Sequence, residues 1–427
     1  MNGGSAIPVN QVINLAAGEK LFLFVTNNNI GNGCNMLVYN GTSLILSMVT
    51  KPVETQHYGM RPFKVFEQLV KKMAPTATAV STYFNSAEGS RVCIFPEHSF
   101  TNPSEAANIV TSFSDFFKFY NSLRPMGLRI EGNNVHMEPL EVLYTSAPVI
   151  MDFGEVKNLN ISYASEMVYN EVKIGYPAAD ASTLGNPGYS GRNSYRIEGN
   201  TNKNILELFP NYITTPSIIE SRRVAPSTKP APPSDSTQIY ACAVENTDDG
   251  FGFYYLYRVP YTTQTGLVPV AAGAHYPLGT LDAYNLEYLT PSRMMRAQGT
   301  VLRPLIEQLP ALTPFKFSSC DRVGDLITGT INEQADLTIG DFNGVQVWHA
   351  FTVAFEAVTP YRFAEIFDAF NGGVVGMLYL GQVIYLVPIG TMKSYPASDK
   401  PAEYKFMIST LTPISTLLIL AQGGFAP

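Results

Sequence analysis

One arrangement of glycine and proline occurs twice in this chain, and it constrains the fold more than any other feature. Residues 127–139 and 376–388 each place two glycines and a proline at the same spacing. The matched positions are Gly127, Gly132 and Pro139 in the first stretch and Gly376, Gly381 and Pro388 in the second. Each stretch follows aromatic residues at helical spacing, which predicts a unit of helix, strand, turn and strand. Such a pair arises either by duplication or by chance. The unit carries no reactive residues, which indicates that it is a structural part of the protein.

The charge content predicts that part of the surface is covered by other chains. Charged residues make up 15% of the 427 residues, whereas a soluble domain usually has about 25%. The chain also contains 25 Phe and 24 Tyr. A chain with so few charges is better explained if neighbouring subunits cover part of its surface. The alternative is a β-rich monomer with a Ser, Thr and Asn surface.

The net charge argues against nucleic acid as the main partner. It is −7 with an isoelectric point near 5.4, and the basic residues are dispersed, with Arg222-Arg223 and Lys71-Lys72 as the adjacent pairs. Phosphate binding requires clustered Lys and Arg, so we expect no specific nucleic-acid binding.

The four cysteines fit no metal-ligand spacing: they are Cys34, Cys93, Cys242 and Cys320. Cysteines scattered in this way usually serve as small apolar residues in a protein made in a reducing cytoplasm. The sequence does not decide whether any of them form disulfides. The N-terminus lacks the basic and long apolar regions of a signal peptide, and the apolar run 414–421 is too short to span a bilayer. We therefore expect neither export through a signal pathway nor stable membrane insertion.

Composition and periodicity predict a β-rich α+β fold with barrel-like or sandwich β domains and short helices. The expected parts are a small β region at 1–60, a helix-plus-β domain at 61–216, a Pro/Ser-rich arm or linker at 217–236, and a second β-rich domain at 237–427. The arm is expected to be extended because its composition resists a packed core.

Local patterns place individual elements. We expect helices at 62–72, at 113–123 with Thr111 or Ser112 as the cap, and at 292–297. We expect strands at 149–154, 159–163, 167–177 and 346–355, the third of them with Asn170 among inward-facing Val168, Val172 and Ile174. Segments 86–104 and 178–200 are predicted to be loops, and residues 141–144 to continue a strand.

The sequence shows few signs of catalytic or metal-binding chemistry. None of the five histidines lies three or four residues from another, which argues against a metal pair on a helix; they are His57, His98, His136, His275 and His349. Asp152 with Glu155 and the pair Asp248-Asp249 lie in turn contexts, where a cap or loop role is the commoner one. The sequence thus predicts no catalytic residue, no metal site and no cofactor, while a pair of carboxylates from distant strands stays open.

The tyrosines near the start of the second half admit two interpretations. Tyr254, Tyr255, Tyr257 and Tyr261 could stack on sugar rings, but a sheet face or a subunit contact is the favoured interpretation.

Three segments together resemble structural proteins of tailed bacteriophages and prophages of the Bacteroidetes lineage. They are residues 127–139 with the preceding helix, the strand 168–176, and residues 284–295. Their order is also similar to that of tail-hub proteins, in which such units build barrel domains arranged as rings. The resemblance covers roughly residues 110 to 410 and implies no catalytic residues; the first sixty residues and the Pro-rich arm have no counterpart in it.

We therefore expect a virion structural protein of a tailed phage, a tail hub, baseplate or adaptor ring component, made in the host cytoplasm. Its expected partners are copies of itself in a ring and other tail or connector proteins, with an acidic inner face that repels DNA. The alternative is a carbohydrate-binding or glycan-degrading surface protein. The residues expected at contacts between subunits are Arg222, Arg223, Pro226, Pro230, Pro232 and Pro233.

Overall fold

The computed structural model describes a large part of the chain. The described residues are 59–101, 109–144, 149–151, 156–167, 169–176, 192–197, 203–214, 238–243, 258–260, 262–263, 282–284, 289–306, 316–319, 326–328, 331–332, 335–357, 374–379, 382–387, 392–393, 402–413 and 415–416. By its internal contacts the chain divides into two units, Met1–Met48 and Val49–Pro427, and all the described residues belong to the second.

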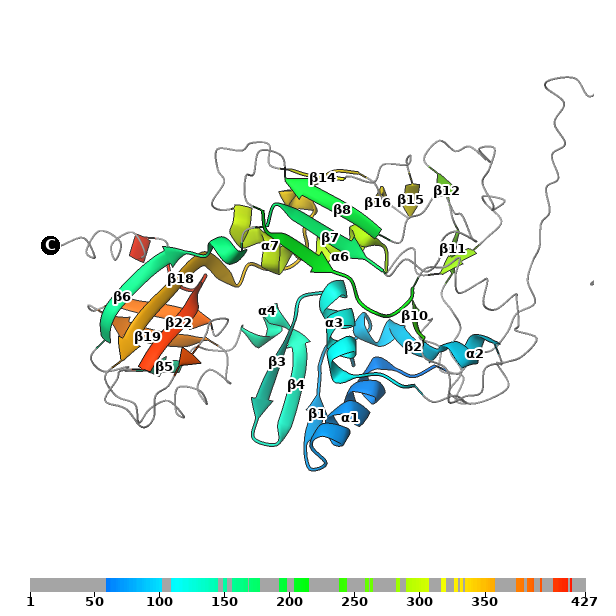
Figure 1. The fold of residues 1–427 in the computed structure, drawn as a ribbon, viewed down its shortest axis with the longest axis horizontal. Coiled ribbons are helices and arrows are strands. Elements are labelled where there is room, and N and C mark those ends of the chain that lie inside the picture. The colour runs from blue at the N-terminus through cyan, green and yellow to red at the C-terminus, as the bar shows by residue number, and fades with distance from the viewer. Residues whose placement is uncertain are drawn as a thin grey trace, which may run out of the picture. The chain divides into compact units, whose positions relative to one another are not determined.

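The predicted fold class is confirmed: the second unit is a β-rich α+β structure with several sheets and short helices (Figure 1). Its helices are α1 (Pro62–Met73), α2 (Glu97–Thr101), α3 (Phe113–Leu123), α4 (Leu140–Leu143), α6 (Pro291–Ala297) and α7 (Gly299–Ile306), with 3-10 turns η1 (Gly89–Arg91), η2 (Ser165–Met167) and η3 (Ile339–Asp341).

Three of the helices lie where the sequence predicts them. Helix α1 begins with Pro62 and buries Val65, Phe66, Leu69 and Val70 on one face. In α3, Ser112 is the N-cap, because its side chain accepts a hydrogen bond from the backbone N–H of Asp115. In α6, Thr290 caps in the same way by accepting from Arg293. Helix α7, which carries Pro304 inside it, was not predicted.

The first hairpin of the repeated pattern belongs to a three-stranded sheet. Strands β3 (Met126–Glu131) and β4 (Asn134–Pro139) pair antiparallel, and β1 (Thr78–Val80) lies parallel to β4, so the order is β1-β4-β3. Strand β2 (Val92–Pro96) pairs antiparallel with β10 (Ile239–Ala243), and all the residues of both are buried.

The second hairpin belongs to a larger sheet. Strands β19 (Val375–Tyr379) and β20 (Gln382–Val387) are antiparallel, and the strand order is β5-β19-β20-β22-β18-β6, with β21 on β22. Among the described strands this path is open, with β5 and β6 at its ends. The remaining members are β5 (Val149–Met151), β6 (Val156–Tyr163), β18 (Trp348–Ala357), β21 (Met392–Lys393) and β22 (Ala402–Ser409).

Both hairpins are confirmed, but they are not paired in the same register. Gly127 lies opposite Glu138, which is eleven positions on, whereas Gly376 lies opposite Tyr385, which is nine positions on. The shared Gly and Pro spacing therefore does not correspond to one repeated turn. The helix expected before the second hairpin lies outside the described residues.

A five-stranded sheet joins distant parts of the sequence. Its order is β17-β14-β8-β7-β9, and its strands are β7 (Glu171–Gly175), β8 (Arg192–Ile197), β9 (Ile205–Leu208), β14 (Lys316–Ser319) and β17 (Leu337–Thr338). Smaller sheets contain β11 (Arg258–Pro260) with β13 (Asp282–Tyr284), and β12 (Thr262–Thr263) with β15 (Leu326–Thr328) and β16 (Ile331–Asn332).

Strand pairing crosses the domain boundary expected from composition at 217–236. Strand β14 pairs with β8, β10 pairs with β2, and β18 pairs with β6, so three sheets contain strands from both sides of that segment. The segment itself lies outside the described residues, as do residues 1–58 of the expected N-terminal β region.

Three predicted elements were wrong, and a fourth was predicted with the wrong bounds. Segment 86–104, predicted to be a loop, contains β2 and α2, and segment 178–200 contains β8. Residues 140–143 form the helical turn α4 in place of a continued strand. The strand expected at 167–177 is shorter: η2 ends at Met167 and β7 begins only at Glu171, so Asn170 precedes the strand.

Three apolar clusters form the core of the described residues, and the smallest comprises Ala164, Val347, Trp348, Val374, Val387 and Met407. The largest joins α1, α3, β7 and β8, and its aromatic centre comprises Phe66, Phe84, Phe116, Phe119 and Tyr120, with ring centroids 4.7 to 6.3 Å apart. Such pairs add to the stabilisation from burial alone. The second lies on the β5–β6 sheet and comprises Val353, Phe355, Val375, Met377, Ile384, Leu386, Phe406 and Ile408.

The junction between α6 and α7 yields a stability prediction. A Cβ at Gly299 would lie 1.8 Å from the backbone oxygen of Asn343, whereas a Cβ at Gly340 meets only the Thr338 hydroxyl, at 3.8 Å. Gly299→Ala should therefore lower the free energy of unfolding by about 1 to 3 kcal/mol, the usual cost of overpacking. Gly340→Ala is the matched control and should change it by less than about 0.5 kcal/mol. Urea unfolding of both variants measures this, and equal stabilities would contradict the packing described at Gly299.

Candidate interaction surface

The turn of the first hairpin is held by glycine and by hydrogen bonds to a neighbouring loop. Gly132 and Asn133 are the two residues between β3 and β4, and Gly132 has a φ of +56°, which glycine adopts without strain. The Asn133 side-chain amide donates to the carbonyl of Thr76 at 3.1 Å, and the N–H of Thr78 donates to the carbonyl of Asn133 at 2.9 Å. The tip of the hairpin is therefore fixed to the start of β1.

One face of the hairpin changes from buried to exposed along its length. Met126, Leu128 and Ile130 alternate along β3 and so share a face. Met126 is buried, whereas Leu128 is 46% exposed and Ile130 is 57% exposed. Across the ladder, Leu128 lies opposite buried Met137 and Ile130 opposite half-buried Val135. The base of this face thus belongs to the core, and its outer half presents apolar side chains to solvent.

The opposite face carries charge at its outer end. The Arg129 guanidinium donates to the Glu131 carboxylate at 2.9 Å, and His136 Nε2 lies 3.6 Å from the same carboxylate. Near the base, this face is covered by α4, since a Cβ at Gly127 would meet the side chains of Leu143 and Leu140 at 2.5 and 2.9 Å. Glycine at position 127 allows α4 to approach the hairpin closely.

The carboxylate of Glu138 anchors the base of the hairpin. Glu138 is 4% exposed, and it accepts hydrogen bonds from the Thr82 N–H, from the Thr82 hydroxyl at 2.9 Å and from the Tyr83 N–H at 3.1 Å. Ser81, just before them, donates its hydroxyl to the carbonyl of Met137 at 2.8 Å. A buried carboxylate is stable only when donors surround it, so these bonds fix β4 against the loop after β1.

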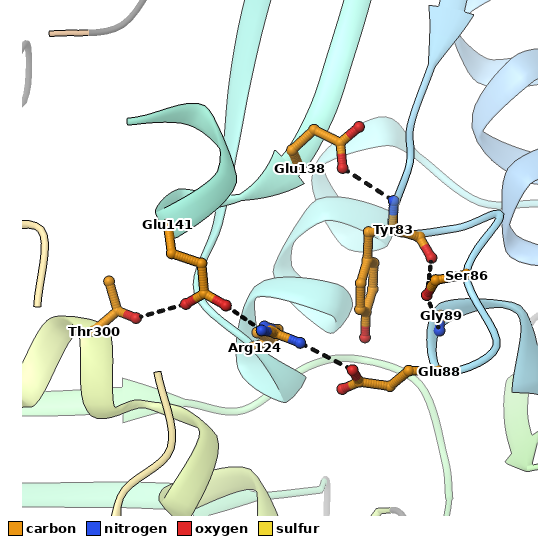
Figure 2. A network of polar contacts seen from close by, with 8 residues as sticks. All are labelled: Tyr83, Ser86, Glu88, Gly89, Arg124, Glu138, Glu141 and Thr300. Atoms are coloured by element: carbon orange, nitrogen blue, oxygen red, sulfur yellow. Dashed lines mark hydrogen bonds and ion pairs between the residues drawn. The ribbon is translucent and has the colours of Figure 1, made fainter. Parts of the chain in front are cut away.

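Arg124 extends this anchor to α4 and α7 (Figure 2). It follows α3 as the C-cap residue and bonds both the Glu88 carboxylate, at 2.9 Å, and the Glu141 carboxylate. Glu141 also accepts from the Thr300 hydroxyl at 3.0 Å. Figure 2 shows Arg124 between the two carboxylates, with the Tyr83 ring close by, and the guanidinium carbon lies 5.8 Å from that ring's centre.

The charge state of Arg124 fits this arrangement. Partial burial alone would lower its pKa, but the hydrogen bond to Glu141 and the negative charges of Glu88 and Glu141 outweigh burial and raise the pKa. We call Glu88, Arg124, Glu138, Glu141 and Thr300 the hairpin anchor. All three of its carboxylates accept hydrogen bonds within the fold, so they act here as structural groups.

Strand β3 is the outer strand of its sheet among the described strands. The order β1-β4-β3 leaves it paired on one side only, by β4. An edge strand presents backbone N–H and C=O groups that another chain can pair with. The edge of β3 together with Leu128 and Ile130 forms what we call the apolar edge, and it is the best candidate for a functional surface in the described part of the chain.

Other polar groups in the described residues are structural or apart from one another. His349 is buried, with Nε2 3.1 Å from the carbonyl of Thr412, and His98 lies buried in α2. Within the described ranges no three His, Cys, Asp or Glu side chains gather closely enough to hold a metal ion, and no helix there is long and apolar enough to cross a membrane.

The contact residues predicted from the sequence lie outside the described residues. They are Arg222, Arg223, Pro226, Pro230, Pro232 and Pro233, and the same holds for His57, His275, Asp152, Glu155, Asp248, Asp249 and for Tyr254, Tyr255, Tyr257 and Tyr261. Their roles stay predictions.

The hairpin anchor and the apolar edge were not predicted as functional features. The available signal for the edge was the apolar alternation of Met126, Leu128 and Ile130 on a strand next to a glycine turn. The anchor had no local signal, because Glu88, Arg124 and Thr300 are distant in the sequence.

Comparisons of this chain with known protein families, with curated proteins and with solved structures give no match.

The anchor yields a second stability prediction. Glu138→Gln replaces one acceptor oxygen with an amide that meets N–H donors, so it should lower the free energy of unfolding by about 1 to 3 kcal/mol. The control is Glu67→Gln on α1, where Glu67 pairs with exposed Lys64 and Lys71 and should contribute less than about 1 kcal/mol. Thermal and urea unfolding measure both, and a loss for Glu138→Gln no larger than for Glu67→Gln would show that the anchor does not hold the hairpin.

Proposed function

We propose that this chain is a structural protein of a tailed-phage virion, a tail hub, baseplate or adaptor ring component that assembles around the tail axis. The observation that carries the proposal is the apolar edge. Leu128 and Ile130 are exposed on an edge strand whose base is held by buried hydrogen bonds. A rigid apolar strand edge is suited to docking, since little conformational freedom is lost when it binds.

The low charge of the chain supports the same proposal. With 15% charged residues, the protein has few ionic groups with which to keep such an edge in solution. Exposed long edge strands are normally protected by lysine, proline or a covering element. On β3 the charges of Arg129 and Glu131 neutralise each other at 2.9 Å, so they offer weak protection. Coverage by another copy of the chain accounts for both facts.

The resemblance to phage structural proteins supplies the kind of assembly. It includes residues 127–139, which contain Leu128 and Ile130 of the apolar edge. In a ring each subunit contacts its neighbour through two different surfaces, so the apolar edge would meet another region of the adjacent copy. The acidic net charge of −7 suits a component near DNA that does not bind it.

The test is association of the purified full-length chain. Sedimentation velocity over a concentration series should show a closed oligomer, and Leu128→Glu with Ile130→Glu should weaken association by at least about tenfold. Each exposed apolar side chain buried at a contact contributes about 1.5 to 3 kcal/mol, and tenfold corresponds to about 1.4 kcal/mol.

Val345→Glu is the matched control, because Val345 is 67% exposed and lies outside the hairpin; it should leave association unchanged. A chain that stays monomeric at every concentration and binds or hydrolyses glycans on an array would contradict the proposal and favour the carbohydrate-binding alternative.

A further inference from the structure

Two buried cysteines face each other across a strand pair. In the antiparallel register of β2 and β10, Cys93 lies directly opposite Cys242. Both are free thiols and both are 0% exposed. Residues directly opposite in an antiparallel pair project to the same face of the sheet, so the two side chains are neighbours.

The neighbouring hydrogen bonds define what kind of pair this is. Ile94 exchanges backbone hydrogen bonds with Met60, at 2.8 and 2.9 Å, and Ala241 donates its N–H to the carbonyl of Ile213 at 2.9 Å. The backbone N–H and C=O of Ile94 and the N–H of Ala241 therefore point away from the opposite strand of this pair. Because the pattern alternates along the ladder, Cys93 and Cys242 form a hydrogen-bonded pair.

That pairing is compatible with a disulfide. The Cα atoms of a hydrogen-bonded pair lie about 5.5 Å apart, which falls within the range that disulfides span. In such a pair the Cβ atoms are generally about 4.5 to 5.5 Å apart, against about 3.5 to 4.5 Å in disulfides, so the bond would be strained. Strained disulfides are the ones that are reduced most readily.

We propose that Cys93 and Cys242 form a redox site, in which a small-molecule disulfide such as glutathione disulfide oxidises the two thiols to a cross-strand disulfide. A deprotonated protein thiol attacks one sulfur of the oxidant and releases one glutathione thiolate, which leaves a mixed disulfide. The second protein thiol loses its proton and attacks the protein sulfur, and the second glutathione thiolate leaves. Two protein thiols are oxidised and one oxidant disulfide is reduced to two thiols.

Burial determines when the reaction occurs. Burial raises the pKa of Cys93 to about 12, and burial followed by the nearby Cys93 raises the pKa of Cys242. In the closed sheet both thiols stay protonated and shielded, so they react only when β10 opens from β2 or before the two strands pair. Once formed, the bond joins residues on the two sides of segment 217–236. This inference does not depend on the proposed function.

The experiment oxidises the full-length protein with glutathione disulfide, at zero and at sub-denaturing urea, and in parallel refolds it from urea in a glutathione redox buffer. Remaining thiols are blocked with N-ethylmaleimide under denaturing conditions and located by peptide mass spectrometry. We expect a Cys93–Cys242 linked peptide in most refolded molecules, and oxidation of native protein that becomes at least tenfold faster in sub-denaturing urea because opening limits access.

Two variants complete the test. Cys34→Ser with Cys320→Ser should retain the linked peptide, and Cys242→Val should abolish it while Cys93 is recovered as a blocked thiol. The proposal is overturned if refolded protein carries Cys93 and Cys242 as free thiols, or if either of them links to Cys34 or Cys320.

Discussion

The buried carboxylate of Glu138 is the interaction on which the β3–β4 hairpin depends. A carboxylate that is almost fully buried must be surrounded by donors, and here the donors come from Thr82 and Tyr83 in a different segment. Close to Glu138, the Arg124 guanidinium joins two further carboxylates, those of Glu88 and Glu141. Directional bonds thus hold the hairpin at its base, as those of Asn133 hold its tip, while the side chains of Leu128 and Ile130 stay exposed.

A fixed hairpin suits the proposed docking role better than a mobile one, because less conformational freedom is lost on binding. Leu128 and Ile130 lie on the same face as buried Met126, so they extend the core outwards along β3. In a chain with few charged residues, such a surface is better explained if another chain covers it. This is the physical basis of the proposal that the protein is a subunit of an assembly.

The sequence predicted those elements whose signals are local. Helices α1, α3 and α6 combine an apolar face with Pro62, Ser112 or Thr290 at the start, and both hairpins follow from glycine between short strands. Strand β2 was missed because turn-forming residues flank it, although Val92–Pro96 is apolar and wholly buried.

Elements that depend on distant partners could not be predicted. Strand β8 places Asn193 inside the fold. Asn is typical of loops, and here its side chain is satisfied by a hydrogen bond to Ser319 of β14 at 3.0 Å. The Arg124 bridges to Glu88 and Glu141, and the Glu141 contact with Thr300, depend equally on tertiary structure. Periodicity and turn chemistry describe neighbours in sequence, and therefore they do not identify such pairs.

Hydrogen exchange of the β3 amides, measured on dilute and on concentrated protein, tests the central claim most directly. If another copy covers the apolar edge, the exchange of the outward-facing amides of Met126–Glu131 will slow markedly with concentration, while that of α1 will not change. If the β3 amides exchange at the same rate at every concentration while oligomers form, the edge is not the contact and the account of this surface is wrong.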